Sequence, residues 1–249
     1  MRIYEFGKGH PQCLLLIHPS LVTWDFFERV IPLLDDRYHL LIPALPGYDL
    51  EDASEFESVE RCARLLADEL SQRGIRELKA AYGCSMGGSI VLRMAADKRL
   101  GVENYIMDAG ICPYELPWLV TRLIALRDFT VMALGKLGGR KLVARAFSST
   151  RYSDEDLEYV AAMFRHCTLR TLWNTFDSCN NYQMPPGVMR CDGKVRYWYG
   201  ERERKARAWD LRYMVEHVPD TVFKCFAGTD HADLALFHPK RLAQELLEL

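Results

Sequence analysis

The fold of this chain is decided by the stretch Leu78-Lys79-Ala80-Ala81-Tyr82-Gly83-Cys84-Ser85-Met86-Gly87-Gly88. Residues 78–82 predict a strand, and the residues from Ser85 to Ala96 predict a helix. The pattern Gly-x-Ser-x-Gly between them is typical of a very tight turn, on which a serine takes a strained backbone conformation and projects its hydroxyl above the sheet. Glycines two positions to either side leave the space that this turn needs. The pattern therefore indicates Ser85 as a nucleophile, with the backbone N–H of Met86 and the helix N-terminus directed at a developing oxyanion.

A glycine-rich turn can also have a role in packing or anion binding only. The surrounding sequence therefore has to distinguish such a turn from one that carries a nucleophile. Outward from the turn, strands and helices alternate, which is typical of βαβ units and of a mostly parallel central sheet with helices on both faces. We expect further strands over 2–6, 13–17, 38–43, 102–107, 194–199 and 221–226, and further helices over 24–34, 58–73, 205–217 and 239–249. From 113 to about 189, helical patterns follow one another without a strand. The sequence thus predicts an α/β core over 1–112 and 190–249, interrupted by a helical insertion over 113–189.

Composition and charge exclude several classes of protein. The chain has 249 residues, of which 49% are hydrophobic and 27% charged, with a formal net charge of -2. These fractions are ordinary for a globular domain, and such a charge balance argues against nucleic acid as a partner. No apolar run is long enough to span a membrane or to act as a secretory signal, and the eight cysteines contain no C-x-x-C pair. We therefore expect a cytoplasmic protein with reduced thiols and no metal site.

A serine hydroxyl needs a neighbouring base, so we expect a histidine at the same edge of the sheet. Of the seven histidines, His231 fits best. It follows the predicted strand 221–226 through a short loop and precedes the last helix. This position is the carboxyl end of a strand, where the sites of parallel sheets assemble.

Five ordered motifs resemble those of the α/β-hydrolase family, and the resemblance covers essentially the whole chain. They are Ile17-His18-Pro19-Ser20, Pro43-Ala44-Leu45-Pro46-Gly47, Gly83 to Gly88, Tyr199-Gly200-Glu201-Arg202-Glu203, and His231 through Pro239. The resemblance implies an α/β-hydrolase fold that carries a Ser-His-acid triad, with the insertion as a helical cap over the nucleophile. It also implies chemistry without a cofactor.

The resemblance further places the acid of the triad three residues after a glycine that ends a strand. That position is Glu203, which follows Gly200. A carboxylate there would hold the imidazole of His231 in the required tautomer and stabilise its cationic form. Asp108, at the end of the predicted strand 102–107, is the alternative acid, because the family also uses that position.

In the family, the second oxyanion donor commonly follows a His-Gly pair after an early strand. This chain has His18-Pro19 instead. Because proline has no N–H, the expected donor is the backbone N–H of Ser20, with Leu21 as the alternative.

The insertion is rich in aromatic side chains, at Trp118, Phe129, Phe147, Phe164, Trp173, Phe176 and Tyr182. Most of them are expected to form the core of the inserted helices, and any that line a pocket would suit a hydrophobic substrate.

We expect a serine hydrolase that cleaves a carboxylic ester or thioester of a small to medium, largely apolar substrate through an acyl-enzyme. The alternatives are a C–C bond hydrolase or a cofactor-free haloperoxidase of the same fold, and a non-catalytic ligand-binding relative. The sequence leaves the oligomeric state open.

Overall fold

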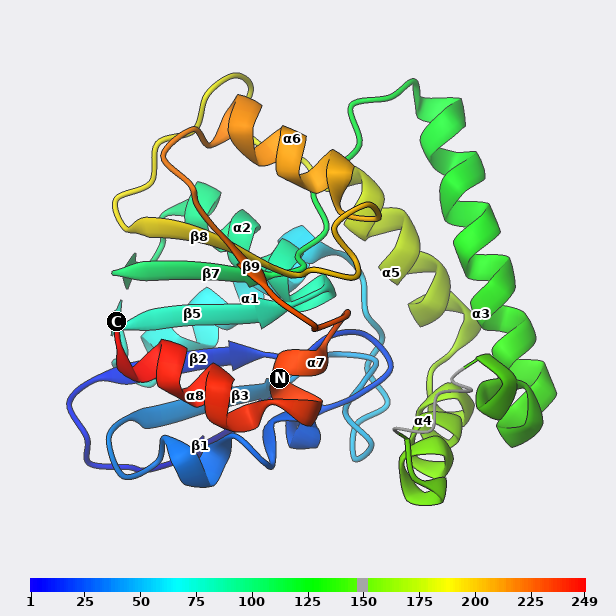
Figure 1. Ribbon diagram of the computed structural model, residues 1–249, viewed down its shortest axis with the longest axis horizontal. Helices are drawn as coiled ribbons and strands as arrows, with labels where there is room; N and C mark the ends of the chain where they lie inside the picture. The colour runs from blue at the N-terminus through cyan, green and yellow to red at the C-terminus, as the bar shows by residue number, and fades with distance from the viewer. Residues whose placement is uncertain (147–151) are drawn as a thin grey trace.

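One mixed sheet of seven strands forms the centre of the protein in the computed structural model, which describes residues 1–146 and 152–249 (Figure 1). The strands are β1 (Arg2–Phe6), β2 (Cys13–Ile17), β3 (His39–Ala44), β5 (Ala80–Cys84), β7 (Asn104–Asp108), β8 (Lys194–Gly200) and β9 (Val222–Phe226). Their order is β1-β3-β2-β5-β7-β8-β9, in which β1 is antiparallel to β3 and the other neighbours are parallel. Two short strands, β4 (Glu77–Leu78) and β6 (Gly101–Val102), pair beside this sheet. The predicted α/β fold with a mostly parallel sheet is confirmed.

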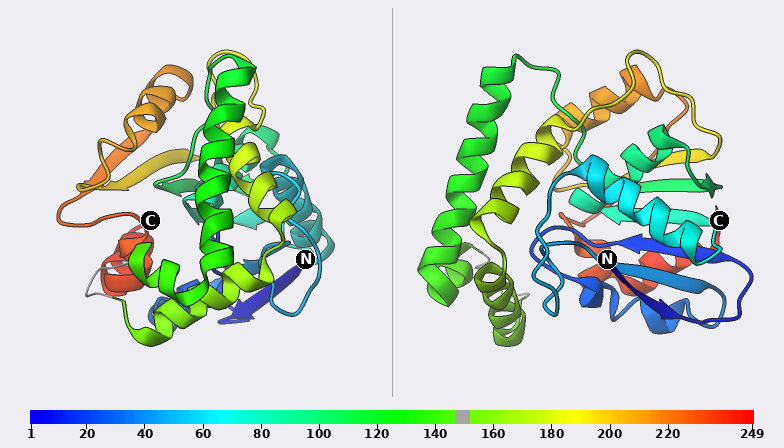
Figure 2. Two further views of the ribbon diagram at one scale, coloured as in Figure 1. Left: turned by 90° about the vertical axis from the view of Figure 1, so that its right-hand side faces the viewer. Right: turned by 180° about the vertical axis from the view of Figure 1, so that it is seen from behind.

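Helices cover both faces of the sheet (Figures 1 and 2). Alternate residues of the strands enter the two layers. Leu15 and Ile17 of β2 pack with α1 (Val59–Gln72), α2 (Met86–Asp97) and α6 (Ala208–His217). Leu14 and Leu16 pack on the opposite side with α7 (Asp233–Phe237) and α8 (Pro239–Leu247). Because successive side chains of a strand point to opposite faces, a strand covered on both faces has to be apolar throughout.

The predicted helix over 24–34 is wrong. This segment forms two 3-10 turns instead, η1 (Trp24–Phe27) and η2 (Ile31–Leu33). Pro32 lies in the first turn of η2 and has no N–H to donate to a helix that continues from Trp24. The apolar side chains Phe27, Val30 and Leu34 are nevertheless buried against the sheet. The apolar spacing thus identified the buried residues, whereas the proline decided the backbone.

Three helices separate β7 from β8 in the chain: α3 (Trp118–Ala146), α4 (Asp154–His166) and α5 (Leu169–Asn181). They lie on the side to which the parallel strands point, with α5 nearer the sheet and α3 on the outside (Figure 1). Hydrogen bonds tie them to the core, from the Tyr48 hydroxyl to Thr175 at 2.7 Å and from Tyr159 to Asp25 at 2.5 Å. Within the described ranges, none of the helices has the length and apolarity to cross a lipid bilayer.

Gly87 lies where the start of α2 presses against the end of β2. A Cβ atom at this position would overlap the carbonyl oxygen of Ile17 and would lie 2.9 Å from that of His18. Because backbone atoms cannot yield as a flexible side chain does, Gly87→Ala is expected to lower the free energy of unfolding by about 2 kcal/mol or more, measured by urea denaturation.

Gly135→Ala is the matched control, because Gly135 is also helical and an added Cβ would meet only the Phe164 ring, at 3.3 Å. Helix propensity favours alanine there by about 1 kcal/mol, so this variant should be neutral or stabilised. Equal destabilisation of both variants would contradict the packing argument.

Candidate active site

Ser85 occupies the tight turn between β5 and α2. Its backbone lies at φ 52 and ψ -116, its N–H donates to the carbonyl of Asp108 at 2.8 Å, and its own carbonyl accepts from Gly88 at 2.9 Å. Gly83 lies so close to Gly87 that a Cβ on Gly83 would overlap the Gly87 carbonyl. The two glycines of the motif therefore allow the strand and the helix to meet in a tight turn, which places the largely buried Ser85 at the edge of the sheet.

Backbone strain gathers at this edge of the sheet. Among the described residues other than glycine, four of the five positive φ angles lie in the loops after β2, β5, β7 and β9, at Leu21 (63°), Ser85 (52°), Ala109 (50°) and Ala232 (62°). The fifth, at Lys98, ends α2. Such a conformation costs a residue with a side chain about 1–3 kcal/mol and persists only where the surrounding structure enforces it. Strain of this kind is typical of functional sites, and here it marks the loops that carry the predicted site residues.

His231 and Glu203 meet at the same edge, although they are far apart in the chain. The Nδ1 of His231 bonds to Oε2 of Glu203 at 2.8 Å, and Oε1 of Glu203 accepts from the Gly200 N–H at 3.1 Å. Burial raises the pKa of Glu203, but the hydrogen bond to His231, the charge of His231, the Gly200 N–H and the charge of Arg207 together bring the pKa below its usual value. An ionised Glu203 requires the proton on Nδ1 of His231, which leaves Nε2 free to accept one.

The hydroxyl of Ser85 has no hydrogen bond to His231 among the described residues. Bonds between a nucleophile and its base are often long in the free enzyme and tighten when the substrate closes the site. Loops after β5, β8 and β9 thus bring the three predicted triad residues to one edge of the sheet.

Asp108, the alternative acid, is buried at the end of β7. Its Oδ2 accepts a hydrogen bond from the hydroxyl of Tyr82 at 2.5 Å. Burial raises the pKa of Asp108 to about 7, and the nearby charge of Glu203 also raises it. Within the part of the chain that is described, no hydrogen bond links its carboxyl group to His231.

The loop after β2 carries the predicted oxyanion donor Ser20. Next to it, the fully buried His18 donates from Nδ1 to the Pro19 carbonyl at 2.7 Å and accepts the Leu45 N–H on Nε2 at 3.1 Å. Burial lowers the pKa of His18 to about 4, so the ring stays neutral and can make both bonds. His18 therefore fixes the backbone that precedes Ser20. The other predicted donor, Met86 N–H, belongs to the first turn of α2, where N–H groups have no acceptor within the helix.

Sequence reasoning missed a buried ionic network behind Glu203. The Nε of Arg207 lies 3.8 Å from Oε2 of Glu203, and its Nη1 lies 3.2 Å from Oδ2 of Asp210. The other carboxylate oxygen of Asp210, Oδ1, accepts the Cys112 N–H at 2.7 Å. Burial raises the pKa of Asp210 to about 6, and Arg207 opposes this shift. The spacing of Glu203, Arg207 and Asp210, at four and three residues, is the signal that could have revealed the network.

The aromatic side chains of the insertion mostly serve packing, as expected. Phe164 and Tyr182 are buried in the core, and Phe129 and Trp173 pack edge to face with ring centres 5.5 Å apart. Trp118 is largely exposed, with 68% of its surface accessible. Phe147 lies outside the described residues.

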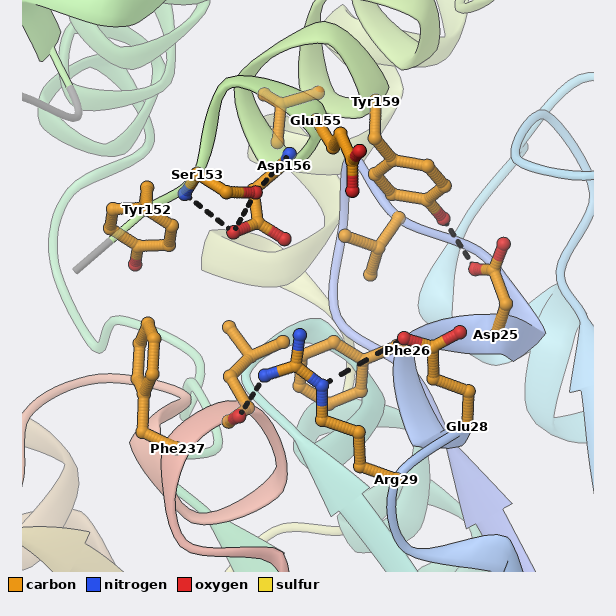
Figure 3. A pocket seen from close by; sticks show the side chains of 13 residues that line it. Asp25, Phe26, Glu28, Arg29, Tyr152, Ser153, Glu155, Asp156, Tyr159 and Phe237 are labelled. Atoms are coloured by element: carbon orange, nitrogen blue, oxygen red, sulfur yellow. Dashed lines mark hydrogen bonds and ion pairs between the residues drawn. The ribbon is translucent and has the colours of Figure 1, made fainter.

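A cavity of about 400 Å³ opens between α4 and the core (Figure 3). Val22 and Leu236 contribute to its wall and lie in the chain shortly after Ser20 and His231, respectively. Its aromatic residues are Phe26, Tyr152, Tyr159 and Phe237, and its charged ones are Asp25, Glu28, Arg29, Glu155 and Asp156. The cavity is therefore aromatic with an excess of acidic groups. Neither Ser85 nor His231 is part of its lining.

Among the described residues, one group of three side chains has the spacing that could hold a metal ion, at Glu115, Glu216 and His217. Its potential ligand atoms lie within 4.8 Å of one another, and Nε2 of His217 already bonds to Oε1 of Glu115 at 3.0 Å. None of the predicted triad residues belongs to this group.

The raised pKa of Asp108 predicts a pH-dependent stability. Below about pH 4 the carboxyl group is protonated in both the folded and the unfolded chain; between about 4 and 7 only the folded state keeps the proton. The folded state then binds more protons, so this group's contribution to the free energy of unfolding falls as the pH rises.

The comparison of wild type with Asp108→Asn isolates this contribution, because other titrating groups such as Asp210 are present in both. The stability of wild type relative to the variant is expected to decrease from pH 4 to pH 7 in urea titrations. Parallel pH profiles would contradict the assignment.

Comparisons with known proteins agree with this architecture. The model of the alpha/beta hydrolase family matches residues 14–245. A pimeloyl-[acyl-carrier protein] methyl ester esterase of Legionella pneumophila is 28% identical over 102 residues, which are 41% of this chain and 38% of that relative. The matched stretch thus spans about two fifths of the relative's length.

Two solved structures resemble the whole chain. An alpha/beta hydrolase family protein from Desulfitobacterium hafniense is 23% identical with a TM-score of 0.76, and 99% of each chain is covered. MenH from S. aureus is 18% identical with a TM-score of 0.78, over 99% of this chain and 96% of the other. At these identities the likeness concerns the fold alone.

Proposed function

Because the chain belongs to the alpha/beta hydrolase family, we propose that it is a serine hydrolase that cleaves carboxylic esters or thioesters through an acyl-enzyme. One observation carries this proposal. Ser85 is strained at φ 52 on the turn from β5 to α2, at the edge where His231 bonds to the buried Glu203 at 2.8 Å. A nucleophile, a base and an acid that orients the base are the groups that acyl transfer requires.

The mechanism follows from the proton positions. His231 Nε2 removes the proton of the Ser85 hydroxyl as its oxygen attacks the carbonyl carbon, and the imidazolium is stabilised by Glu203. The backbone N–H groups of Met86 and Ser20, with Leu21 as the alternative to Ser20, hold the oxyanion of the tetrahedral intermediate. His231 then protonates the departing alcohol or thiol. Water, activated by the same base, hydrolyses the acyl-enzyme and restores Ser85.

A serine at position 85 favours ester chemistry over the epoxide and haloalkane hydrolysis that an aspartate nucleophile would perform. We propose the helices between 113 and 189 as a cap over this site, and the aromatic cavity beside α4 as part of the path of a small to medium, largely apolar substrate. The four carboxyl groups of that cavity face only Arg29 as a cation, which opposes a phosphate-bearing leaving group there.

A cytoplasmic location is part of the same proposal. The free thiols of Cys13, Cys62, Cys84, Cys112, Cys167, Cys179, Cys191 and Cys225 suit a reducing compartment.

Labelling with a fluorophosphonate probe tests the proposed function. The wild type should be labelled covalently at Ser85, and Ser85→Ala should not, because the probe reports an activated serine. A panel of acyl esters and thioesters of increasing chain length, assayed beside the probe, reports the preferred acyl group. Absence of labelling of the wild type would favour a non-catalytic ligand-binding protein. Undiminished labelling of Ser85→Ala would refute Ser85 as the nucleophile.

A further inference from the structure

The outer side of α3 carries a row of exposed leucines. This leucine stripe consists of Leu119, Leu123, Leu126, Leu134 and Leu137, with Thr130 at its centre. Each leucine exposes between 48% and 82% of its surface. The residues recur at three- and four-residue spacings, so they share one face of the helix. Monomeric proteins rarely leave an apolar face of this extent in contact with water.

The opposite side of α3 is already used for packing inside the protein. Phe129 stacks edge to face on Trp173 of α5, and Arg122 forms an ion pair with Asp177 of the same helix. The Nζ of Lys136 donates to the carbonyl groups at the end of α4, at 2.8–2.9 Å. Because these contacts lie on the other side of the helix, the leucine stripe faces away from α4 and α5. The helix itself lies at the outer edge of the molecule (Figure 2).

The stripe reads almost the same from both ends. Its residues are spaced almost symmetrically about residue 128. The outer pair, Leu119 and Leu137, lies nine positions to either side, and the inner pair, Leu126 and Thr130, lies two positions to either side. The middle pair departs from symmetry by one position, with Leu123 five positions before residue 128 and Leu134 six positions after it. We propose that the leucine stripe binds a second copy of this chain, with two α3 helices packed antiparallel about a twofold axis beside residue 128. This arrangement places Leu119 against the partner's Leu137, and Leu126 against the partner's Thr130. An isologous interface requires such a self-complementary pattern.

Charge and size agree with a second copy as the occupant. The leucine stripe contains no charged side chain, and Arg127 at its border is neutralised by Asp128 of its own chain at 2.7 Å. Two copies can therefore approach without repulsion in this region, and their helix dipoles oppose each other favourably in the antiparallel arrangement. With the flanking Val120 and Val131, the exposed apolar area is of the order of the ~800 Å² that one partner contributes to a standard interface.

Sedimentation velocity of the full chain tests the proposal. The wild type is expected to sediment as a species of twice 28.8 kDa. Leu123→Glu should lose the dimer, because each twofold interface would bury two carboxylates. Val215→Glu is the matched control, since Val215 is 59% exposed on α6 and its replacement should leave the dimer intact. Circular dichroism verifies that both variants are folded.

Disulfide cross-linking tests the antiparallel register independently. Residues 119 and 137 are about 27 Å apart along one helix, so Leu119→Cys/Leu137→Cys can bridge only between chains. The double variant should form a covalent dimer on mild oxidation, at a level well above wild type and Leu119→Cys alone.

Results that differ from these expectations would contradict either the antiparallel register or the dimer itself. Equal cross-linking of the single and double variants would overturn the antiparallel register. A wild type that remains monomeric would overturn the proposal, and if that monomer also bound anionic phospholipid vesicles through the leucine stripe, a lipid surface would be the occupant.

Discussion

Ser85→Ala is expected to lower kcat/KM for ester hydrolysis by at least about 10⁴-fold, because the variant has no oxygen to form the acyl-enzyme. The fold should be retained, since alanine fits the space of serine and the bonds of the turn are made by backbone atoms. The rate of an acyl ester substrate, followed with purified protein, measures the effect. Any remaining rate would come from groups that bind the substrate and the oxyanion without a nucleophile.

Ser89→Ala is the matched control for this substitution. Ser89 lies one turn later in α2, and its hydroxyl donates to the carbonyl of Ile111 at 2.8 Å. Its loss should cost about 1 kcal/mol of stability and leave the rate within a few-fold of wild type. A Ser85→Ala variant that retained the wild-type rate would refute the proposed nucleophile.

Glu203→Gln is expected to lower kcat by about 10³–10⁴-fold, whereas Asp108→Asn should change it less than about tenfold. Glu203 bonds to Nδ1 of His231 at 2.8 Å and has a pKa below the usual value, so it remains an anion beside the imidazolium. Asp108 has a pKa raised to about 7 by burial, and its Oδ2 is bonded to Tyr82. A carboxyl group that holds its proton near neutral pH stabilises an imidazolium poorly.

The pair of variants serves as its own control, because both change a buried carboxyl group into an amide of the same shape. Steady-state kinetics at several pH values should give a loss of kcat with little change of KM for Glu203→Gln. The reverse order of losses would assign the acid to Asp108. Similar losses in both variants would mean that the two carboxyl groups act together on His231.

Local patterns in the amino-acid sequence predicted much of the fold. The glycines at 83 and 87 predicted the turn at Ser85, because only the absence of a Cβ allows the start of α2 to lie against β2 and β5. The continuous apolar run at 13–17 predicted a strand covered on both faces. The helix expected over 24–34 failed at Pro32, where a single missing N–H and a rigid ring outweighed the apolar spacing.

The candidate site depended more on contacts between distant segments. The sequence left two acids open, and the choice between them rests on a bond across 28 residues, from Glu203 to His231, which no local pattern encodes. The role of His18 in fixing the loop before Ser20, and the ionic network of Arg207 and Asp210, likewise exist only once these segments pack together.

By itself, the sequence determined the class of fold, the strand-turn-helix unit at Ser85 and the residues that could take part in acyl transfer, because periodicity, glycine and proline act over a few residues. Only the tertiary structure decided which acid contacts His231, which loops are strained, and that one face of α3 stays exposed. These properties follow from burial and from the meeting of loops at the sheet edge, where desolvation and hydrogen bonds between distant residues set the charge of each group.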